Sequence, residues 1–347
     1  MTTGSDLDDD ALGSWLQGRI AGLRLPLRSS RFSGGQSNPT YLLTDAAGQR
    51  YVLRKKPAGQ LLPSAHAIER EYRVMKALEP TQVPVARMLC LCEDASVIGT
   101  PFFVMAHVEG RIFWDPALPE LAPQERTALY ADINRVVAAL HSVDPDAVGL
   151  DDYGRSEGFF ARQIDRWTRQ YRASATESIP AMDRLIDWLP GHIPTSTDVR
   201  IFHGDLRLDN LIFHPIQPRV LAVLDWELST LGHPMADFAY HALPWRLSAQ
   251  QFRGMADKDI GPQSGIPPEM AYLRSYCEAT GRPVDLAEYE FCMAYGMFRL
   301  AAILQGILKR SIDGTASSPQ ARETGLKARA IAEVAWEQVR SKFGVAG

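Results

Sequence analysis

The stretch HGDLRLDN at residues 203–210 and the tetrapeptide LDWE at residues 224–227 carry the strongest signal in this chain of 347 residues. Between them, the apolar runs 211–213 and 220–224 flank a turn that contains two prolines. Short apolar runs bounded by turn residues predict the two strands of a hairpin. A hairpin returns the chain to its starting point, so we expect the two quoted motifs to lie at the same end of it.

The polar residues of these motifs have the types and the order that phosphoryl transfer from a nucleotide requires. Asp205 is predicted to act as the catalytic base that accepts or orients the proton of an attacking hydroxyl. Asn210, five positions later, and Asp225, after the hairpin, offer two oxygen ligands for Mg²⁺. Each residue alone is most often structural, whereas their joint spacing favours a catalytic site.

A turn of small residues lies upstream, between two strand-like runs, and is predicted to bind nucleotide phosphates. Glycine allows backbone N–H groups to approach phosphate oxygens closely, and short polar side chains add hydrogen bonds. The turn matches neither the dinucleotide-binding fingerprint nor the Walker A pattern, and a hairpin turn without a ligand is the alternative. The residues of this turn are Ser33, Gly34, Gly35, Gln36, Ser37 and Asn38.

A basic cluster ends the strand-like run that follows. In protein kinases a cation at the end of the third strand holds the phosphates, and a helix carboxylate positions it. Alignment with that pattern places Arg54 where a lysine is usual, with Lys55 directly after it, and spacing does not choose between them. We expect Glu71, rather than Glu69, to be the partner. A solvated basic loop is the alternative.

Residues 105–108 are predicted to be the hinge between two lobes. Backbone groups of Ala106 and Val108, next to Met105, are expected to hydrogen-bond the edge of adenine. Any peptide backbone offers such groups, so this prediction rests on position along the chain.

Together these motifs resemble those of the aminoglycoside-phosphotransferase-like kinases. The patterns H-G-D-x-x-x-x-N and D-W-E are diagnostic of the broad superfamily. The segments SAHAIEREY at residues 64–72 and DWELSTLGHP at residues 225–234 are most similar to the kinase-like portion associated with some acyl-CoA dehydrogenases. Because a dehydrogenase needs a separate flavin domain, for which the predicted helical tail is too small, we expect no dehydrogenase activity from this chain.

The resemblance implies an α+β, bilobal, protein-kinase-like fold with a small antiparallel β-rich N-lobe and a larger, mainly helical C-lobe. It also implies ATP and Mg²⁺ as cofactors and a small-molecule hydroxyl as acceptor. In the acyl-CoA-associated branch the implied acceptor is a hydroxyacyl-CoA, for example one with its hydroxyl at carbon four.

The resemblance and the residue patterns divide the chain into three parts. Residues 1–10 are acidic and expected to be disordered, residues 11–107 form the nucleotide-binding N-lobe, and residues 108–347 form the C-lobe with the catalytic loop, metal ligands and acceptor pocket. The predicted N-lobe contains one helix at 64–78 and strands near 29–33, 40–44, 51–55, 87–93 and 101–107. Ser318 and Pro319 are predicted to start one last helix that runs to about residue 343.

Composition limits the partners. The net charge of −4 provides no basic field, so we expect neither a nucleic-acid partner nor a membrane partner. Residues 291–308 approach the length of a bilayer span, but Arg299 and Gln305 interrupt them and favour a buried core helix. Four cysteines without a metal-site spacing indicate a reducing, cytoplasmic location. A homodimer is a further expectation that the sequence leaves open.

Residues near the motifs receive supporting roles. His203 and Asp237 are expected to hold the catalytic loop in place. Arg207, Trp226 and Glu227 are candidates for contacts with the acceptor, with packing or ion pairing as the alternative.

Two other functions remain open at this level. One is a kinase for an aminoglycoside, a choline-like molecule or a sugar hydroxyl, which would need an acidic pocket if the acceptor is cationic. The other is a nucleotide-binding pseudokinase or scaffold without turnover, which the arginine at position 54 favours and the catalytic acids oppose.

Overall fold

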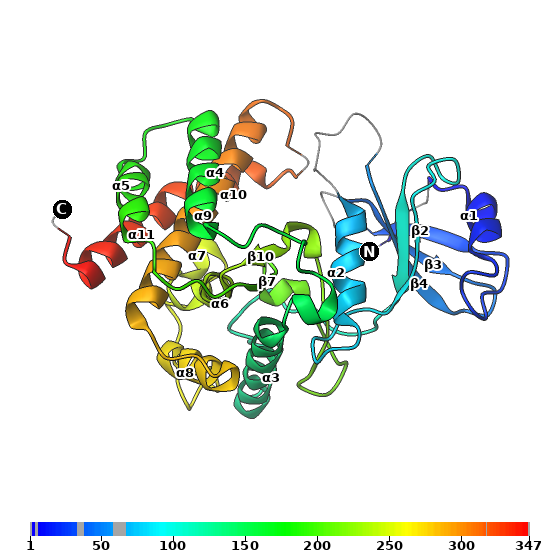
Figure 1. Cartoon of the computed structure of the whole chain (residues 1–347), viewed down its shortest axis with the longest axis horizontal. Coiled ribbons are helices and arrows are strands. Elements are labelled where there is room, and N and C mark those ends of the chain that lie inside the picture. Colours follow the sequence, from blue (N-terminus) through cyan, green and yellow to red (C-terminus); the bar gives the residue numbers. More distant parts are fainter. Residues whose placement is uncertain (1, 4–5, 33–37, 58–66, 317, 346–347) are drawn as a thin grey trace. The chain divides into compact units, whose positions relative to one another are not determined.

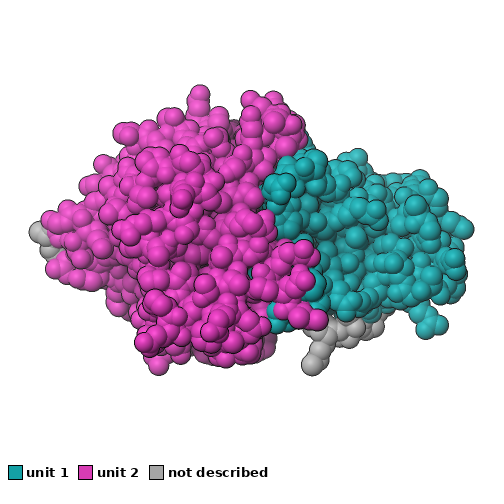
Figure 2. Space-filling view, turned by 90° about the horizontal axis from the view of Figure 1, so that it is seen from below, with its two compact units in different colours: residues 1–111, 212–215, 221–228 teal, residues 112–211, 216–220, 229–347 magenta. Residues whose placement is uncertain are grey.

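The computed structural model describes residues 2–3, 6–32, 38–57, 67–316 and 318–345 (Figure 1). The chain groups into two compact units, which Figure 2 colours separately. Unit 1 consists of residues 1–111, 212–215 and 221–228, and unit 2 consists of residues 112–211, 216–220 and 229–347.

An antiparallel sheet of six strands forms the centre of unit 1, with the strand order β1-β2-β3-β4-β6-β5. β-branched and aromatic residues in these runs favour extended structure, and short turns make the antiparallel pairing possible. The strands are β1 (Thr2–Thr3), β2 (Arg28–Phe32), β3 (Thr40–Thr44), β4 (Arg50–Lys55), β5 (Met88–Cys92) and β6 (Phe102–Ala106).

Two helices cover this sheet, α1 (Asp9–Leu16) and α2 (Ile68–Leu78), and Figure 1 shows them on opposite faces of it. The apolar face of α1 packs with Tyr41 and Leu53 in one buried core. Because side chains alternate between the two faces of a strand, Arg54 faces the α2 side while its neighbours in β4 face α1. This alternation positions the charged groups of the nucleotide-binding region.

The predicted hairpin between the two motifs is present as the paired strands β8 (Leu211–Phe213) and β9 (Val220–Val223). A short 3₁₀ turn, η4 (Trp226–Leu228), follows and contacts α2 within unit 1. Gly110 lies so close to the hairpin that an added Cβ would be 2.2 Å from the carbonyl oxygen of Phe213. Only glycine fits at this approach.

Unit 2 is mainly helical and contains one small strand pair, β7 (Arg200–Phe202) with β10 (Thr230–Gly232). The two units thus have the predicted compositions, and the α+β, protein-kinase-like fold class is confirmed. The helices of unit 2 are α3 (Pro123–Ser142), α4 (Phe159–Ser174), α5 (Pro180–Trp188), α6 (Pro234–Ala242), α7 (Ala249–Phe252), α8 (Glu269–Thr280), α9 (Leu286–Ile312), α10 (Ala321–Gly325) and α11 (Ala328–Phe343).

Helix α9 is the core helix of unit 2 and contacts α4, α6, α10 and α11. Asp285 caps its first turn by accepting a hydrogen bond from the N–H of Glu288 at 3.0 Å. By length and composition α9 could cross a membrane, but 89% of its most apolar window is buried inside the protein. The prediction of a buried core helix is therefore confirmed.

Two features near the termini differ from the predictions. Within residues 1–10, expected to be disordered, the described residues 2–3 and 6–10 include β1 and the start of α1. Asp6 accepts a hydrogen bond from the hydroxyl of Tyr41, and Asp9 accepts one from the N–H of Ser29. The predicted last helix is two helices, α10 and α11. Gly325 ends the first, at a position where an added Cβ would be 2.6 Å from the backbone of Leu308.

Candidate active site

The loop that carries Asp205 lies in unit 2 and is fixed through its backbone. Asp237, in the first turn of α6, accepts hydrogen bonds from the N–H of His203 at 2.6 Å and of Gly204 at 3.0 Å. Gly204 has a φ of +86°, which glycine adopts without strain. His203 Nδ1 in turn lies 3.2 Å from the N–H of Asp205. These contacts fix the backbone of the loop and therefore the direction in which the side chain of Asp205 points.

Asp237 remains a carboxylate although it is fully buried. Burial alone would raise the pKa of Asp237, but hydrogen bonds from His141 and from the His203 N–H hold it below the ordinary value. Burial also lowers the pKa of His141, which lies 3.3 Å from Asp237. The predicted positions of His203 and Asp237 beside the catalytic loop agree with this arrangement; their effect on activity remains a prediction.

Arg299 holds the same loop from α9, a role that was not predicted from the sequence. Its side chain donates to the carbonyl of Gly204 and stacks on Tyr240, with the guanidinium carbon 4.7 Å from the ring centroid. Arg299 is only 4% exposed. A cation inside an apolar helix needs a buried partner. The position of Arg299 within the apolar run 291–308 was therefore the signal in the sequence for such a contact.

The carboxylate of Asp205 is held by two neighbours in its own loop. The side-chain NH₂ of Asn210 donates to Asp205 Oδ2 at 3.0 Å and to the Asp205 carbonyl at 2.8 Å. Arg207 Nη2 lies 3.3 Å from the same Oδ2 atom. Because the NH₂ group of Asn210 faces Asp205, its amide oxygen faces away. Oxygen is the donor that Mg²⁺ prefers, so this orientation suits a metal ligand.

Tyr240 is a further neighbour of Asp205 that sequence reasoning missed. It lies on α6, and burial together with the Asp205 carboxylate raises its pKa to about 12. The hydroxyl therefore stays protonated and offers a hydrogen bond to Asp205. No spacing rule connects a helix tyrosine with a loop 35 positions earlier, and the sequence held no signal for it.

In unit 1, Arg54 is the basic residue whose side chain contacts the predicted acidic partners. Its Nε lies 3.1 Å from Glu71, and its Nη2 lies 2.9 Å from Asp225 and 3.3 Å from Glu227. Lys55 points to the other face of β4, where its Nζ is 5.6 Å from the ring centroid of Tyr41. The structure thus brings Arg54 and Glu71 together and places Lys55 apart from them.

Glu71 is buried between two polar partners. Asn38 Nδ2 donates to Glu71 Oε1 at 2.8 Å, and Arg54 lies beside the other oxygen. Burial raises the pKa of Glu71 to about 7, against the attraction of Arg54. The rest of the predicted phosphate-binding turn, Ser33, Gly34, Gly35, Gln36 and Ser37, lies outside the described residues. Of the predicted turn, the structure therefore describes Asn38, which is a hydrogen-bond partner of Glu71 in α2.

Asp225 has an unusual backbone. Its φ of +65° lies in the left-handed region, which costs energy for most residues and which aspartate tolerates better than most. Asp225 comes two residues after the end of β9, and its carboxylate contacts Arg54. A negatively charged oxygen donor held on a strained backbone fits the prediction of a Mg²⁺ ligand.

The predicted hinge lies at the end of β6. Met105 and Ala106 are its last two residues, and Val108 follows outside the strand. The N–H of Ala106 donates to the carbonyl of Arg87 at 2.8 Å. Adenine binding through this particular N–H is therefore inconsistent with the structure, and the carbonyl of Ala106 and the backbone of Val108 remain the predicted groups.

The three candidate acceptor contacts have different environments. Trp226 is 1% exposed and donates its indole N–H to the carbonyl of Val223 at 3.0 Å, so the predicted acceptor contact is wrong and the ring is part of the core. Glu227 pairs with Arg54. Arg207 lies beside Asp205 and lines a pocket within unit 2.

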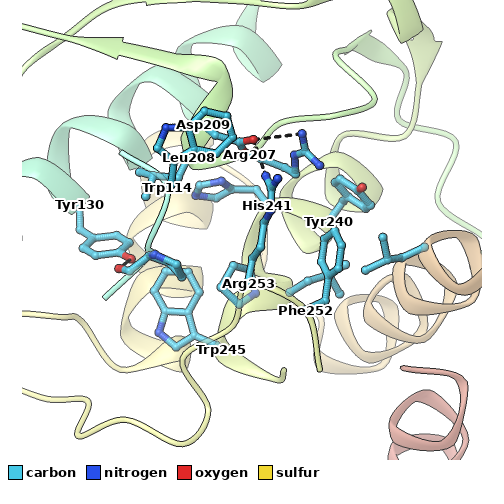
Figure 3. Close-up of a pocket in the computed structure, with 14 residues that line it drawn as sticks. Trp114, Tyr130, Arg207, Leu208, Asp209, Tyr240, His241, Trp245, Phe252 and Arg253 are labelled. Atoms are coloured by element: carbon cyan, nitrogen blue, oxygen red, sulfur yellow. Dashed lines mark hydrogen bonds and ion pairs between the residues drawn. The ribbon is translucent and has the colours of Figure 1, made fainter. Parts of the chain in front are cut away.

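That pocket is shown in Figure 3. Residues 207–209 of the catalytic loop form one wall, and aromatic side chains from α3, α6 and the segments around α7 surround it. Asp209 is joined to both Arg207 and Arg253 in this view. The pocket therefore combines aromatic walls with a charged group that is already paired.

Comparison with known proteins agrees with this geometry. Residues 29–284 match the family model described as the phosphotransferase enzyme family. The chain belongs to this family. It is thus an enzyme of the phosphotransferase class, and the resemblance to aminoglycoside phosphotransferases is confirmed.

Individual relatives extend the comparison. A crystal structure from Ralstonia eutropha, with a provisional assignment as an aminoglycoside phosphotransferase, is 54% identical with a TM-score of 0.89, covering 96% of this chain and 99% of that chain. Acyl-CoA dehydrogenase family member 10 of Mus musculus is 50% identical over 95% of this chain. This chain spans 31% of that mouse protein. Spectinomycin phosphotransferase, solved with ADP and spectinomycin, shares the fold at 12% identity with a TM-score of 0.62, covering 96% of this chain and 100% of that chain.

Proposed function

We propose that this phosphotransferase moves the γ-phosphoryl group of ATP to a hydroxyl of a hydroxyacyl-CoA, with Asp205 as the catalytic base. The observation that carries the proposal is the fixed carboxylate of Asp205. Two backbone bonds to Asp237 hold its loop, and Asn210 and Arg207 hold its Oδ2 atom. A base that is held before the acceptor binds loses little entropy when the reaction begins.

The nucleotide and metal are assigned to residues that suit them chemically. Asn210 directly precedes β8 and Asp225 follows β9, and two paired strands joined by a short connection run antiparallel, so these oxygen donors stand at the same end of the hairpin. We assign Mg²⁺ to them and the ATP phosphates to Arg54, which Glu71 positions. When bound, Mg²⁺ neutralises phosphate charge during the transfer. A related fold solved with ADP supports the choice of nucleotide.

The chemical step then needs little from the protein besides position and charge. The acceptor hydroxyl gives its proton to Asp205 while its oxygen forms a bond to the γ-phosphorus. The bond from that phosphorus to the β–γ bridging oxygen breaks, and ADP leaves with the bond's electron pair. Arg207 and Asn210 keep the Asp205 carboxylate aimed at the acceptor oxygen throughout.

The choice of a hydroxyacyl-CoA acceptor rests on two observations. The mouse relative carries the name of an acyl-CoA dehydrogenase family member, and half of its aligned residues are identical. In addition, Asp209 is the acid among the described residues that line the pocket beside the catalytic loop, and it is already joined to two arginines, which disfavours a cationic acceptor.

A screen of acceptors tests this proposal. Purified protein is incubated with ATP, Mg²⁺ and a panel of hydroxyacyl-CoAs, aminoglycosides, choline and sugars, and products are identified by the added mass of one phosphoryl group. We expect phosphorylated hydroxyacyl-CoA. Phosphorylation of only the other acceptors would overturn the acceptor class, and tight ATP binding without any product would support a pseudokinase.

A further inference from the structure

The pocket beside the catalytic loop has walls that are mostly apolar. Two of its aromatic residues use their polar atoms in hydrogen bonds to backbone carbonyls: the hydroxyl of Tyr130 donates to the carbonyl of Pro116, and the indole N–H of Trp245 donates to the carbonyl of Pro267 at 2.9 Å. What these rings present to the pocket is therefore carbon. Its lining also includes Phe252, Leu300 and the strongly exposed Trp114.

The charged groups in the same walls are already paired with one another. Asp209 pairs with Arg207 at 3.2 Å and with Arg253, whose guanidinium carbon lies 5.3 Å from the ring centroid of Trp114. Burial lowers the pKa of His241 to about 4, so its ring is neutral at pH 7. A cationic acceptor would thus meet two arginines and one acid that is already satisfied.

Two residues connect this pocket with the catalytic base. Arg207 lines the pocket, and its Nη2 lies 3.3 Å from Asp205 and 3.2 Å from Asp209. Tyr240 lines the pocket as well and is a neighbour of Asp205. A ligand in the pocket therefore lies within one side chain of the proposed reaction centre.

The loop at the mouth is held in a defined shape. Arg253 has a φ of +44°, and at Gly254 an added Cβ would be 1.8 Å from the carbonyl oxygen of Leu247. The chain thus tolerates backbone strain at the point where Arg253 reaches over Trp114 and toward Asp209. The segment that carries Arg253 is therefore a formed part of the pocket lining.

We propose that this pocket binds the acyl chain of the acceptor, with Trp114 and Phe252 as the walls that select for chain length. This inference rests on the proposed function, because it assigns a site for part of the same acceptor. Apolar walls gain free energy from each methylene of an acyl chain that they bury. The residue pair Arg207 and Tyr240 then places the chain next to Asp205.

Binding that does not depend on turnover tests the assignment. Saturated acyl-CoAs without a hydroxyl, from acetyl-CoA to decanoyl-CoA, are titrated into the full chain by calorimetry. We expect affinity to rise roughly fourfold per methylene until the pocket is filled, as for burial of a CH₂ group. In Trp114→Ala and Phe252→Ala the rise with chain length should be much shallower.

Ile216→Ala is the matched control, because Ile216 is 79% exposed and lies outside the pocket lining. It should keep the wild-type chain-length dependence, and thermal unfolding checks that all variants fold. An unchanged dependence in both pocket variants, or none in the wild type, would overturn the pocket assignment even if hydroxyacyl-CoA is phosphorylated. If the chain-length dependence appears and is lost in the variants while no hydroxyacyl-CoA is phosphorylated, the pocket stands and the proposed function fails.

Discussion

The alternation of side chains along β4 determines that Arg54, and not the adjacent Lys55, contacts the acidic side chains. Arg54 contacts Glu71 through Nε and Asp225 through Nη2, at 3.1 and 2.9 Å. A planar guanidinium can reach two carboxylates in different directions, whereas the ammonium of lysine is a single point of charge. The arginine at this position is therefore matched to its neighbours, and its presence is no sign of a lost activity.

Substitution of Arg54 separates it from Lys55. We expect Arg54→Lys to raise the KM for ATP roughly tenfold, because one of the charge-assisted contacts that orient the cation is lost. Lys55→Met should change KM much less, since Lys55 lies against Tyr41. Steady-state kinetics with varied ATP measures both. Equal increases in the two variants would contradict the assignment of Arg54.

At the scale of elements, α6 fixes the catalytic loop through Asp237. We expect Asp237→Asn to lower kcat strongly and to lower the free energy of unfolding by about 1–3 kcal/mol for each backbone N–H that loses its acceptor. Asp165→Asn, which breaks an exposed ion pair with Arg169, should cost less than about 1 kcal/mol. Urea denaturation and turnover rates give both quantities. Equal stability losses in the two variants would show that Asp237 does not support the loop.

Helix α6 also contributes a pH dependence through His241. Its pKa is about 4 in the folded protein and 6.5 ordinarily, so between these values the unfolded chain binds a proton that the folded chain does not. Through this residue, the free energy of unfolding decreases by about 3 kcal/mol as the pH falls from above 6.5 to about 4.

Substitution of this residue tests the prediction. In His241→Gln the amide can keep the hydrogen bond to Tyr272, and the decrease in unfolding free energy between pH 7 and pH 4.5 should be smaller than in the wild type. The dependence should not vanish, because burial also lowers the pKa of His233 to about 4. Urea denaturation at the two pH values measures it, and identical decreases in both proteins would refute the prediction.

Local spacing predicted the elements well and long-range contacts poorly. Asp205 and Asn210 lie five positions apart in one loop, so the contact between them in the structure is a local one. Arg299 and Tyr240 reach the same loop from α9 and α6, and no periodic pattern records such contacts. Trp226 was misplaced because it directly follows a proposed metal ligand, whereas the turn after Asp225 directs the ring into the core.

For the whole molecule, we expect nucleotide and metal to stabilise the folded protein. A ligand that binds only the folded state at a concentration of 100 times its Kd adds about 2.7 kcal/mol to the free energy of unfolding. We expect ATP with Mg²⁺ to raise the Tm, and Asp225→Ala to remove the part of the shift that depends on Mg²⁺. Thermal unfolding with and without a chelator measures this. A chelator-independent shift in the wild type would argue against the metal ligands.

We propose that the carboxylate of Asp205 serves phosphoryl transfer from ATP to a hydroxyl. The most direct measurement compares the wild type and Asp205→Asn for transfer from radiolabelled ATP to a hydroxyacyl-CoA, with ATP binding measured in parallel. We predict that the variant binds ATP as the wild type does and that its kcat falls by roughly 10²–10⁴-fold, the usual contribution of a positioned base. Equal turnover in the two proteins would show that Asp205 is not the catalytic base.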